Sequence, residues 1–232
     1  QQSLPFVAEG MGRLDAVQRL RLSMVFQMMA WSAAAAAIVL VQSKTMQRAV
    51  GERLTGDGKR IRVVRAGPGM TPVGNGPRTG GGRRRGGDLS LVYVGNASTY
   101  KNLEVVMDGM SRIERMGRPA TLIATLERGS VNPRRARVDV IGYVDEQRLV
   151  AAYRAADCLV MPSLSETVCF PLVEAMSNGL PVVAADRPYA REVCESAAVY
   201  FDPLNPEDLA RAVLEATAEG PRRDRRIEEG YR

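Results

Sequence analysis

Short apolar runs alternate with segments of helical spacing along most of the chain. The runs are rich in Val, Leu, Ile and Ala, and they are bounded by polar or glycine-containing turns. The predicted strands are 89–94, 120–125, 138–141, 158–161, 181–184 and 199–201, and the predicted helices between them are 103–116, 147–156 and 171–177. A last helix is expected after Asn205, a capping residue followed by Pro206. Strands that alternate with helices predict βαβ units and a parallel sheet, an α/β fold.

The first 65 residues predict a helix over 14–34, a strand over 38–41, a short helix over 44–54 and a strand over 61–64. From Met24 to Val41 there are 18 residues without a charge, which is near the length of a membrane span. Gln27 and Ser32 interrupt this stretch, and its alanines add little hydrophobicity. We interpret it as a buried helix followed by a buried strand, with a spanning helix as the alternative.

The composition changes abruptly over residues 66–87, which contain nine glycines, three prolines and four arginines. Such a segment holds no regular element, so we expect a linker or loop, with Arg83–Arg85 more typical of a solvated basic loop than of a nucleic-acid or lipid contact. The predicted organisation is a first unit over 1–65, this linker, a Rossmann-like sheet domain over 88–220 and a charged tail over 221–232.

Charge and cysteine content exclude several chemistries. The chain has 32 basic and 26 acidic residues, a net charge of +6, no histidine and three cysteines. Nucleophilic systems that rely on histidine, and a four-ligand zinc site, cannot be assembled. We expect Cys158, Cys169 and Cys194 to be reduced, buried thiols in a cytoplasmic protein without an export signal. Basic charge without interleaved aromatic residues argues against nucleic-acid binding.

Two loops are expected at the carboxyl edge of the sheet, where ligands of such folds bind: Gly95–Asn102 and Ser163–Pro171. Dinucleotide and P-loop fingerprints are absent, and no Asp-x-Asp pair is present to hold a metal ion on a diphosphate. The second loop leads into a helix whose N-terminus offers backbone N–H groups to an anion. Glu166 and Glu174 flank that N-terminus and suit the recognition of vicinal hydroxyls, although a structural role near a helix dipole is the plainer alternative for Glu174.

The segment Pro162–Val183, which reads PSLSETVCFPLVEAMSNGLPVV, resembles the signature of the family 4 (group 1) glycosyltransferases. Val92–Leu103 and Gly142–Val144 resemble the diphosphate and nucleobase loops of the same family. The resemblance covers residues 89–217 and implies the donor-binding lobe of a retaining GT-B enzyme. Residues 1–65 are then similar to the end of the N-terminal, acceptor-side lobe, a truncated remnant of it.

The resemblance implies specific roles. Lys101 would neutralise the diphosphate, Glu166 would bind the transferred sugar, and both would be catalytic. The other implied donor-binding residues are Gly95, Asn96, Val144, Thr167, Val168, Cys169, Phe170 and Glu174. The donor would be a nucleoside-diphosphate sugar, used without a metal or other cofactor, and the acceptor a glycan or lipid-linked molecule. Location in the cytoplasm, with peripheral association at the inner face of the membrane, is also implied.

The sequence departs from the family pattern at two places. Asn96 stands where many members have arginine, and Thr167-Val-Cys replaces the more usual Gly-Phe-Gly. Two other functions therefore stay open: a sugar-nucleotide epimerase or phosphorylase of the same fold, and a non-catalytic nucleotide-binding module.

Overall fold

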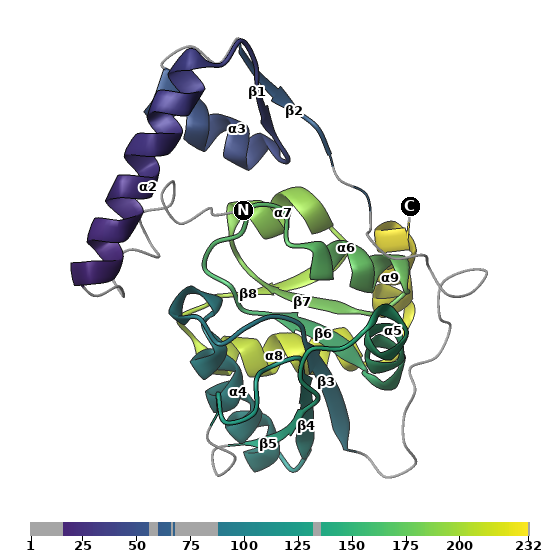
Figure 1. Ribbon diagram of the computed structural model, residues 1–232. Helices are drawn as coiled ribbons and strands as arrows, with labels where there is room; N and C mark the ends of the chain where they lie inside the picture. Colours follow the sequence, from purple (N-terminus) through teal and green to yellow (C-terminus); the bar gives the residue numbers. More distant parts are fainter. Residues whose placement is uncertain (1–15, 56–59, 66, 68–87, 132–135, 232) are drawn as a thin grey trace.

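The computed structural model describes residues 16–55, 60–65, 67, 88–131 and 136–231 (Figure 1). The predicted linker, apart from Gly67, and its Arg83–Arg85 run lie outside these residues. The described part has two units: an N-terminal unit over 16–65 and a larger sheet domain over 88–231.

Six parallel strands form the sheet of the larger domain. They are β3 (Leu89–Tyr93), β4 (Ala120–Ala124), β5 (Arg137–Val140), β6 (Cys158–Met161), β7 (Val182–Ala185) and β8 (Ala198–Phe201). Their order across the sheet is β5-β4-β3-β6-β7-β8, so the chain first moves outward from β3 in one direction and then in the other. This is the strand order of Rossmann folds, and the expected Rossmann-like α/β fold is confirmed.

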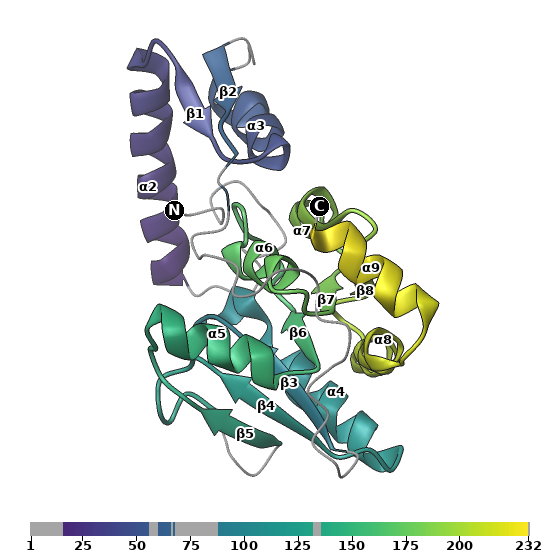
Figure 2. The ribbon, with the colours of Figure 1, turned by 90° about the vertical axis from the view of Figure 1, so that its right-hand side faces the viewer.

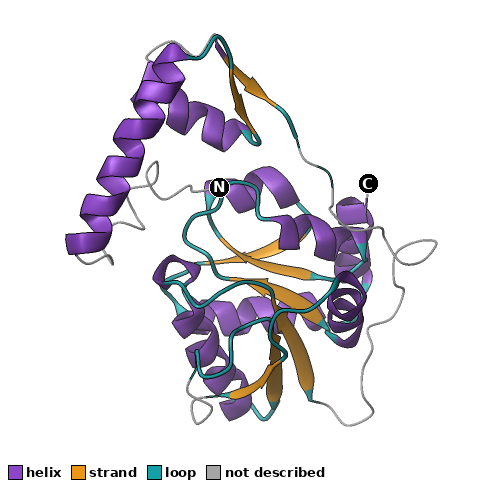
Figure 3. Ribbon diagram, in the orientation of Figure 1, coloured by secondary structure: helices purple, strands orange, loops and turns teal. Residues whose placement is uncertain are grey.

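Helices cover both faces of this sheet, as Figures 2 and 3 show. On one face pack α4 (Leu103–Arg115) and α8 (Pro206–Thr217), and on the other α5 (Glu146–Ala155), α6 (Phe170–Ser177) and α7 (Pro188–Cys194). Side chains alternate between the two layers along each strand: Leu91 and Tyr93 face α4 and α8, whereas Val92 faces α5 and α6. Because both faces are buried, the strands read as continuous apolar runs.

The N-terminal unit contains α2 (Ala16–Ala35), β1 (Val39–Val41), α3 (Lys44–Val50), a π-helical turn (Gly51–Thr55) and β2 (Ile61–Val63). β1 and β2 pair in parallel. A small core lies between these two strands and the helices α2 and α3, and it consists of Val41, Met46, Val50 and Ile61. Partly buried Phe26 on α2 packs against this core.

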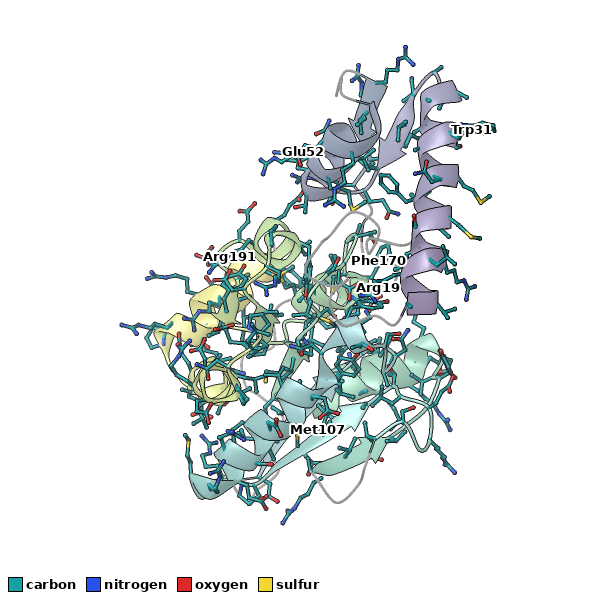
Figure 4. All side chains as sticks on the ribbon, turned by 90° about the vertical axis from the view of Figure 1, so that its left-hand side faces the viewer. Arg19, Trp31, Glu52, Met107, Phe170 and Arg191 are labelled. Atoms are coloured by element: carbon teal, nitrogen blue, oxygen red, sulfur yellow. The ribbon has the colours of Figure 1, made fainter. Side chains whose placement is uncertain are left out.

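The predicted burial of residues 24–41 is largely wrong. On α2, Met24, Met28 and Trp31 are 58%, 73% and 86% exposed, and Figure 4 shows Trp31 projecting away from the rest of the chain. The small β1–β2–α3 layer is only wide enough to cover one side of α2, and this is the physical reason for the difference. No helix among the described residues combines the length and the apolar content needed to cross a bilayer.

The hydrophobic pattern does not predict two of the observed helices, α7 and α9 (Pro221–Tyr231). The charged segment after residue 220, expected as a tail, forms α9. This helix packs on α6, where Gly230 lies beside Met176, and its Ile227 is buried. α7 is only seven residues long and was not predicted. The helix after Asn205 is confirmed as α8, and the Asn205 side chain accepts hydrogen bonds from the N–H groups of Glu207 and Asp208.

Gly109 lies where α4 packs tightly against α8. A Cβ at this position would lie 2.4 Å from Leu209 Cδ2 and 3.3 Å from the carbonyl oxygen of Pro206. We expect Gly109→Ala to destabilise the fold by about 1–3 kcal/mol through overpacking, although helix propensity alone favours alanine by about 1 kcal/mol. Urea denaturation measures this. Ser111→Ala on the same helix is the control, and a Gly109→Ala variant more stable than the parent would contradict the packing described here.

Candidate functional site

The point where the strand order reverses lies between β3 and β6, and the loops that leave these two strands meet there. The N–H of Leu164, after β6, donates a 2.8 Å hydrogen bond to the carbonyl oxygen of Tyr100, after β3. Asn102 joins a third loop, because its Nδ2 donates to the carbonyl oxygen of Pro203 at 2.8 Å. In open parallel sheets this reversal is where ligands bind, outside the carboxyl ends of the strands.

Lys101 and Glu166 form an ion pair across these loops. Lys101 Nζ lies 2.5 Å from Glu166 Oε1, and the two side chains are only 13% and 14% exposed. Burial works against the ammonium of Lys101, but the charge of Glu166 and the hydrogen bond to it outweigh this, so that the pKa of Lys101 is raised. Lys101 therefore stays charged, with its charge held at the reversal point of the sheet.

The same loop continues from Glu166 into the N-terminus of α6. Val168 and Cys169 are buried, and Cys169 has a left-handed backbone with φ of 60°, which is uncommon for a residue other than glycine. α6 then begins at Phe170, with Pro171 in its first turn. The first backbone N–H groups of a helix have no partner within it, and the helix dipole is positive at this end, so the arrangement favours an anion.

Glu174 lies one turn further along α6. Tyr153 on α5 donates a 2.8 Å hydrogen bond from its hydroxyl to Glu174 Oε2. Burial raises the pKa of Glu174, and the Tyr153 hydrogen bond opposes this effect. The carboxylate is thus oriented by a neighbouring helix.

The Gly95–Asn96 turn after β3 is built around Tyr93. The Tyr93 hydroxyl donates to the carbonyl oxygen of Asn96 at 2.6 Å, and the N–H of Gly95 donates to Thr125 Oγ1 at 3.0 Å. A Cβ on Gly95 would lie 2.9 Å from the Tyr93 hydroxyl oxygen, so glycine is required by space as well as by its positive φ. Val144 lies in the loop between β5 and α5, at the same edge of the sheet.

The structure thus brings Lys101 and Glu166 into contact and places the Thr167–Phe170 segment directly beside them. Gly95, Asn96 and Val144 occupy neighbouring loops of the same edge. Sequence reasoning missed Tyr153, whose partner Glu174 is 21 residues away. It also missed Ser43 and Glu192, which join the N-terminal unit to this region. A single sequence contains no local signal for such long-range pairs.

The three cysteines are free and buried, as predicted. Burial raises the pKa of all three thiols, to about 12 for Cys194. They are therefore protonated and unreactive at neutral pH, so thiolate chemistry of Cys169 is not part of the candidate site. The described residues contain no cluster of three or more His, Cys, Asp or Glu side chains with the arrangement of a metal site.

Comparison with protein families gives a match over the C-terminal part of the chain. Residues 133–232 match the family described as glycosyl transferases group 1. This match covers less than half of the chain, but it includes Glu166, Glu174 and the whole of α6.

Among individual relatives, the chain is 31% identical to the O-antigen chain mannosyltransferase B of Escherichia coli over 139 residues, which are 54% of this chain and 36% of that protein. It is 33% identical to a sulfoquinovosyl transferase of Arabidopsis thaliana over 41% of this chain and 19% of that protein. The chain therefore spans well under half the length of these relatives.

Solved structures of low sequence identity have the same fold. Sucrose-phosphate synthase from Thermosynechococcus elongatus superposes with a TM-score of 0.74 at 20% identity, covering 97% of this chain and 58% of that one. A protein of Anabaena solved in complex with UDP and glucose gives a TM-score of 0.68 at 17% identity, covering 89% of this chain and 60% of that one. These likenesses establish a sheet domain of the GT-B type.

The Lys101–Glu166 pair makes a prediction about stability. Lys101→Met leaves the Glu166 carboxylate without its partner, and Glu166→Gln does the same to the Lys101 ammonium. Both groups are largely buried, so each variant is expected to lose about 1–3 kcal/mol of unfolding free energy. The double variant is expected to lose less than the sum of the two. Because the pKa of Lys101 is raised, the contribution of the pair persists below the ordinary lysine value of 10.5 and is lost as the pH rises through the higher, folded value. Urea denaturation of the four proteins measures both effects. Strictly additive losses would show that the two side chains do not interact.

Proposed function

We propose that the sheet domain binds a nucleoside-diphosphate sugar and that the whole protein is a retaining, family 4 glycosyltransferase, which moves a hexose from this donor to a glycan or lipid-linked acceptor. The observation that carries the proposal is the Lys101–Glu166 pair beside the N-terminus of α6, at the reversal point of the sheet. Support comes from the group 1 match and from relatives named as mannosyl and sulfoquinovosyl transferases.

The proposed role of Lys101 follows from the charge changes of transfer. When the bond between the anomeric carbon and the diphosphate oxygen breaks, negative charge increases on the diphosphate. The acceptor hydroxyl oxygen bonds to the same carbon, and its proton leaves with the diphosphate. The Lys101 ammonium and the N–H groups of Val168, Cys169 and Phe170 stabilise this growing charge more than they stabilise the intact donor, which lowers the barrier.

The two glutamates are assigned to hydroxyl groups of the donor. Glu166, in contact with Lys101, accepts hydrogen bonds from the sugar, so that the sugar–phosphate bond lies beside the ion pair. Glu174, oriented by Tyr153, accepts from the ribose hydroxyls. The Gly95–Asn96 turn contacts the phosphates, Thr167 lines the sugar site, and the backbone near Val144 contacts the base. Protein groups alone neutralise the diphosphate in this proposal, with no metal ion or other cofactor.

The N-terminal unit is proposed to be the last part of a larger acceptor-side lobe. Its sheet has only two strands among the described residues, and parallel sheets are normally buried on both faces. Its helix α2 exposes Leu20, Met24, Met28 and Trp31 at helical spacing, which is typical of a helix face that packs against further structure. We further propose a cytoplasmic protein that associates peripherally with the inner membrane face. The three free, buried thiols support the first part, and the net charge of +6 supports the second.

Calorimetric titration with UDP, GDP and their sugar conjugates tests donor binding. Lys101→Ala is expected to weaken diphosphate binding about tenfold or more, because a charge-assisted contact to an anion is lost. Arg115→Ala removes a cation from the far end of α4 and serves as the control. Negligible heats for the parent and for Lys101→Ala alike would refute the proposal. Product analysis with labelled donor separates transfer from epimerisation or phosphorolysis.

The hydrogen bond between Tyr153 and Glu174 leads to a second prediction. Tyr153→Phe keeps the ring but removes the hydrogen bond that orients Glu174, so discrimination between UDP and deoxyuridine diphosphate is expected to fall about threefold to tenfold. Competition titration measures the ratio of the two affinities. Glu174→Gln should reduce the same ratio, whereas unchanged ratios in both variants would remove Glu174 from ribose recognition.

A further inference from the structure

The N-terminus of α3 is held by a side chain from the other unit. Glu192 on α7 accepts hydrogen bonds from the N–H of Lys44 at 2.5 Å, the N–H of Thr45 at 2.7 Å and the hydroxyl of Thr45 at 2.6 Å. The first N–H groups of a helix lack partners within it, and a carboxylate satisfies them with charge-assisted bonds. Glu192 is thus a capping residue for a helix nearly 150 residues earlier in the chain.

The charge state of Glu192 agrees with this geometry. Burial raises the pKa of its carboxyl, but the hydrogen bonds from Thr45 and Lys44 and the positive charge of Arg65 outweigh burial and lower the pKa overall. The donors and Arg65 all belong to the N-terminal unit. The carboxylate is therefore ionised at neutral pH and stabilises the contact between α3 and α7.

A second bond at the same place reaches the candidate donor site. Ser43, the capping residue of α3, accepts from the N–H of Met46 at 3.1 Å and donates its hydroxyl proton to the carbonyl oxygen of Thr167 at 3.0 Å. Ser43 is only 5% exposed, and its hydroxyl uses its single donor in this bond. The residue that begins α3 therefore also contacts the loop that carries Glu166.

This bond controls the direction of one of the amides proposed to bind the donor. The peptide between Thr167 and Val168 is planar and trans, so its carbonyl and its N–H point in opposite directions. Because the Thr167 carbonyl points at Ser43, the N–H of Val168 points away from the N-terminal unit. The next residue, Cys169, has a left-handed backbone, a conformation that persists only where surrounding contacts hold it.

We propose that Ser43 and Glu192 act as positioning residues that couple the N-terminal unit to the donor loop, so that nucleotide affinity depends on the contact between the two units. Glu192 anchors the start of α3 on α7, and Ser43, fixed by this anchor, sets the Thr167–Val168 peptide. The proposal rests on the proposed function only for the ligand. The coupling itself is a property of the described contacts.

The test uses the full 232-residue chain and two measurements. Hydrogen exchange reports the amides of Lys44, Thr45 and Leu172, the last of which donates to the carbonyl oxygen of Cys169 at the end of the donor loop. Calorimetry gives the dissociation constants of UDP and GDP. Ser43→Ala and Glu192→Gln are each expected to speed exchange at these amides about fivefold to tenfold and to weaken binding of the preferred diphosphate by a similar factor. The double variant should show little more than either single change, because the two residues act in series.

Two matched variants guard against a general loss of structure. Glu195→Gln makes the same chemical change at the end of the same helix and should leave both measurements at parent values. Ser43→Thr keeps the hydroxyl and should restore binding and protection toward those of the parent. If Ser43→Thr were as impaired as Ser43→Ala, the hydroxyl would not be the coupling group, and the proposal would be overturned.

The two proposals fail in different ways. If the parent binds UDP or GDP and the Ser43 and Glu192 variants bind equally well, the coupling is refuted while the proposed function stands. If the parent binds neither diphosphate, the proposed function fails, and exchange alone decides the coupling. Faster exchange at Leu172 in Glu192→Gln, a change made on another helix, then supports it, and unchanged exchange there overturns it.

Discussion

The contact on which the site depends is the ion pair between Lys101 and Glu166. Each residue follows one of the two strands between which the order of the sheet reverses, so the pair joins the two halves of the domain at their carboxyl edge. Desolvating both charges is costly, and that cost is met only because they lie in direct contact. Such a pair is weak evidence for a gain in stability, and it supports the proposed donor site instead.

Backbone strain around this pair points in the same direction. Asn102 and Cys169 both have left-handed backbones, and each directly precedes the first residue of a helix that leaves the site, α4 and α6. Asn102 is held by bonds to two other loops through its side chain. Positions of this kind cost free energy, and they tend to gather where a loop must present particular groups to a ligand.

The two units meet next to the same loop. The N-terminal unit has a core of its own, but it is small, and α2 leaves much of its apolar surface exposed. Two sets of described hydrogen bonds join it to the sheet domain: Lys44 and Thr45 donate to Glu192, and Ser43 donates to the carbonyl oxygen of Thr167. A domain contact made of a few polar bonds is easily broken and re-formed, which suits a site that must admit and release a ligand between units.

The sequence by itself determined the fold class and the edge of the sheet that bears the site. The strands are buried on both faces, so their apolar runs stand out, and Asn205 with Pro206 marks the start of α8 by local chemistry. Glu166 and Glu174 could be selected because they flank the N-terminus of a helix that follows one of those strands, whereas Lys101 was selected through the resemblance to a family motif. α9 could not be predicted, since one buried isoleucine among many charges gives no periodic signal. The exposure of α2, the Tyr153–Glu174 bond and the capping of α3 by Glu192 were decided by tertiary structure alone. Each depends on which surfaces meet across many residues, and local pattern contains no information about that.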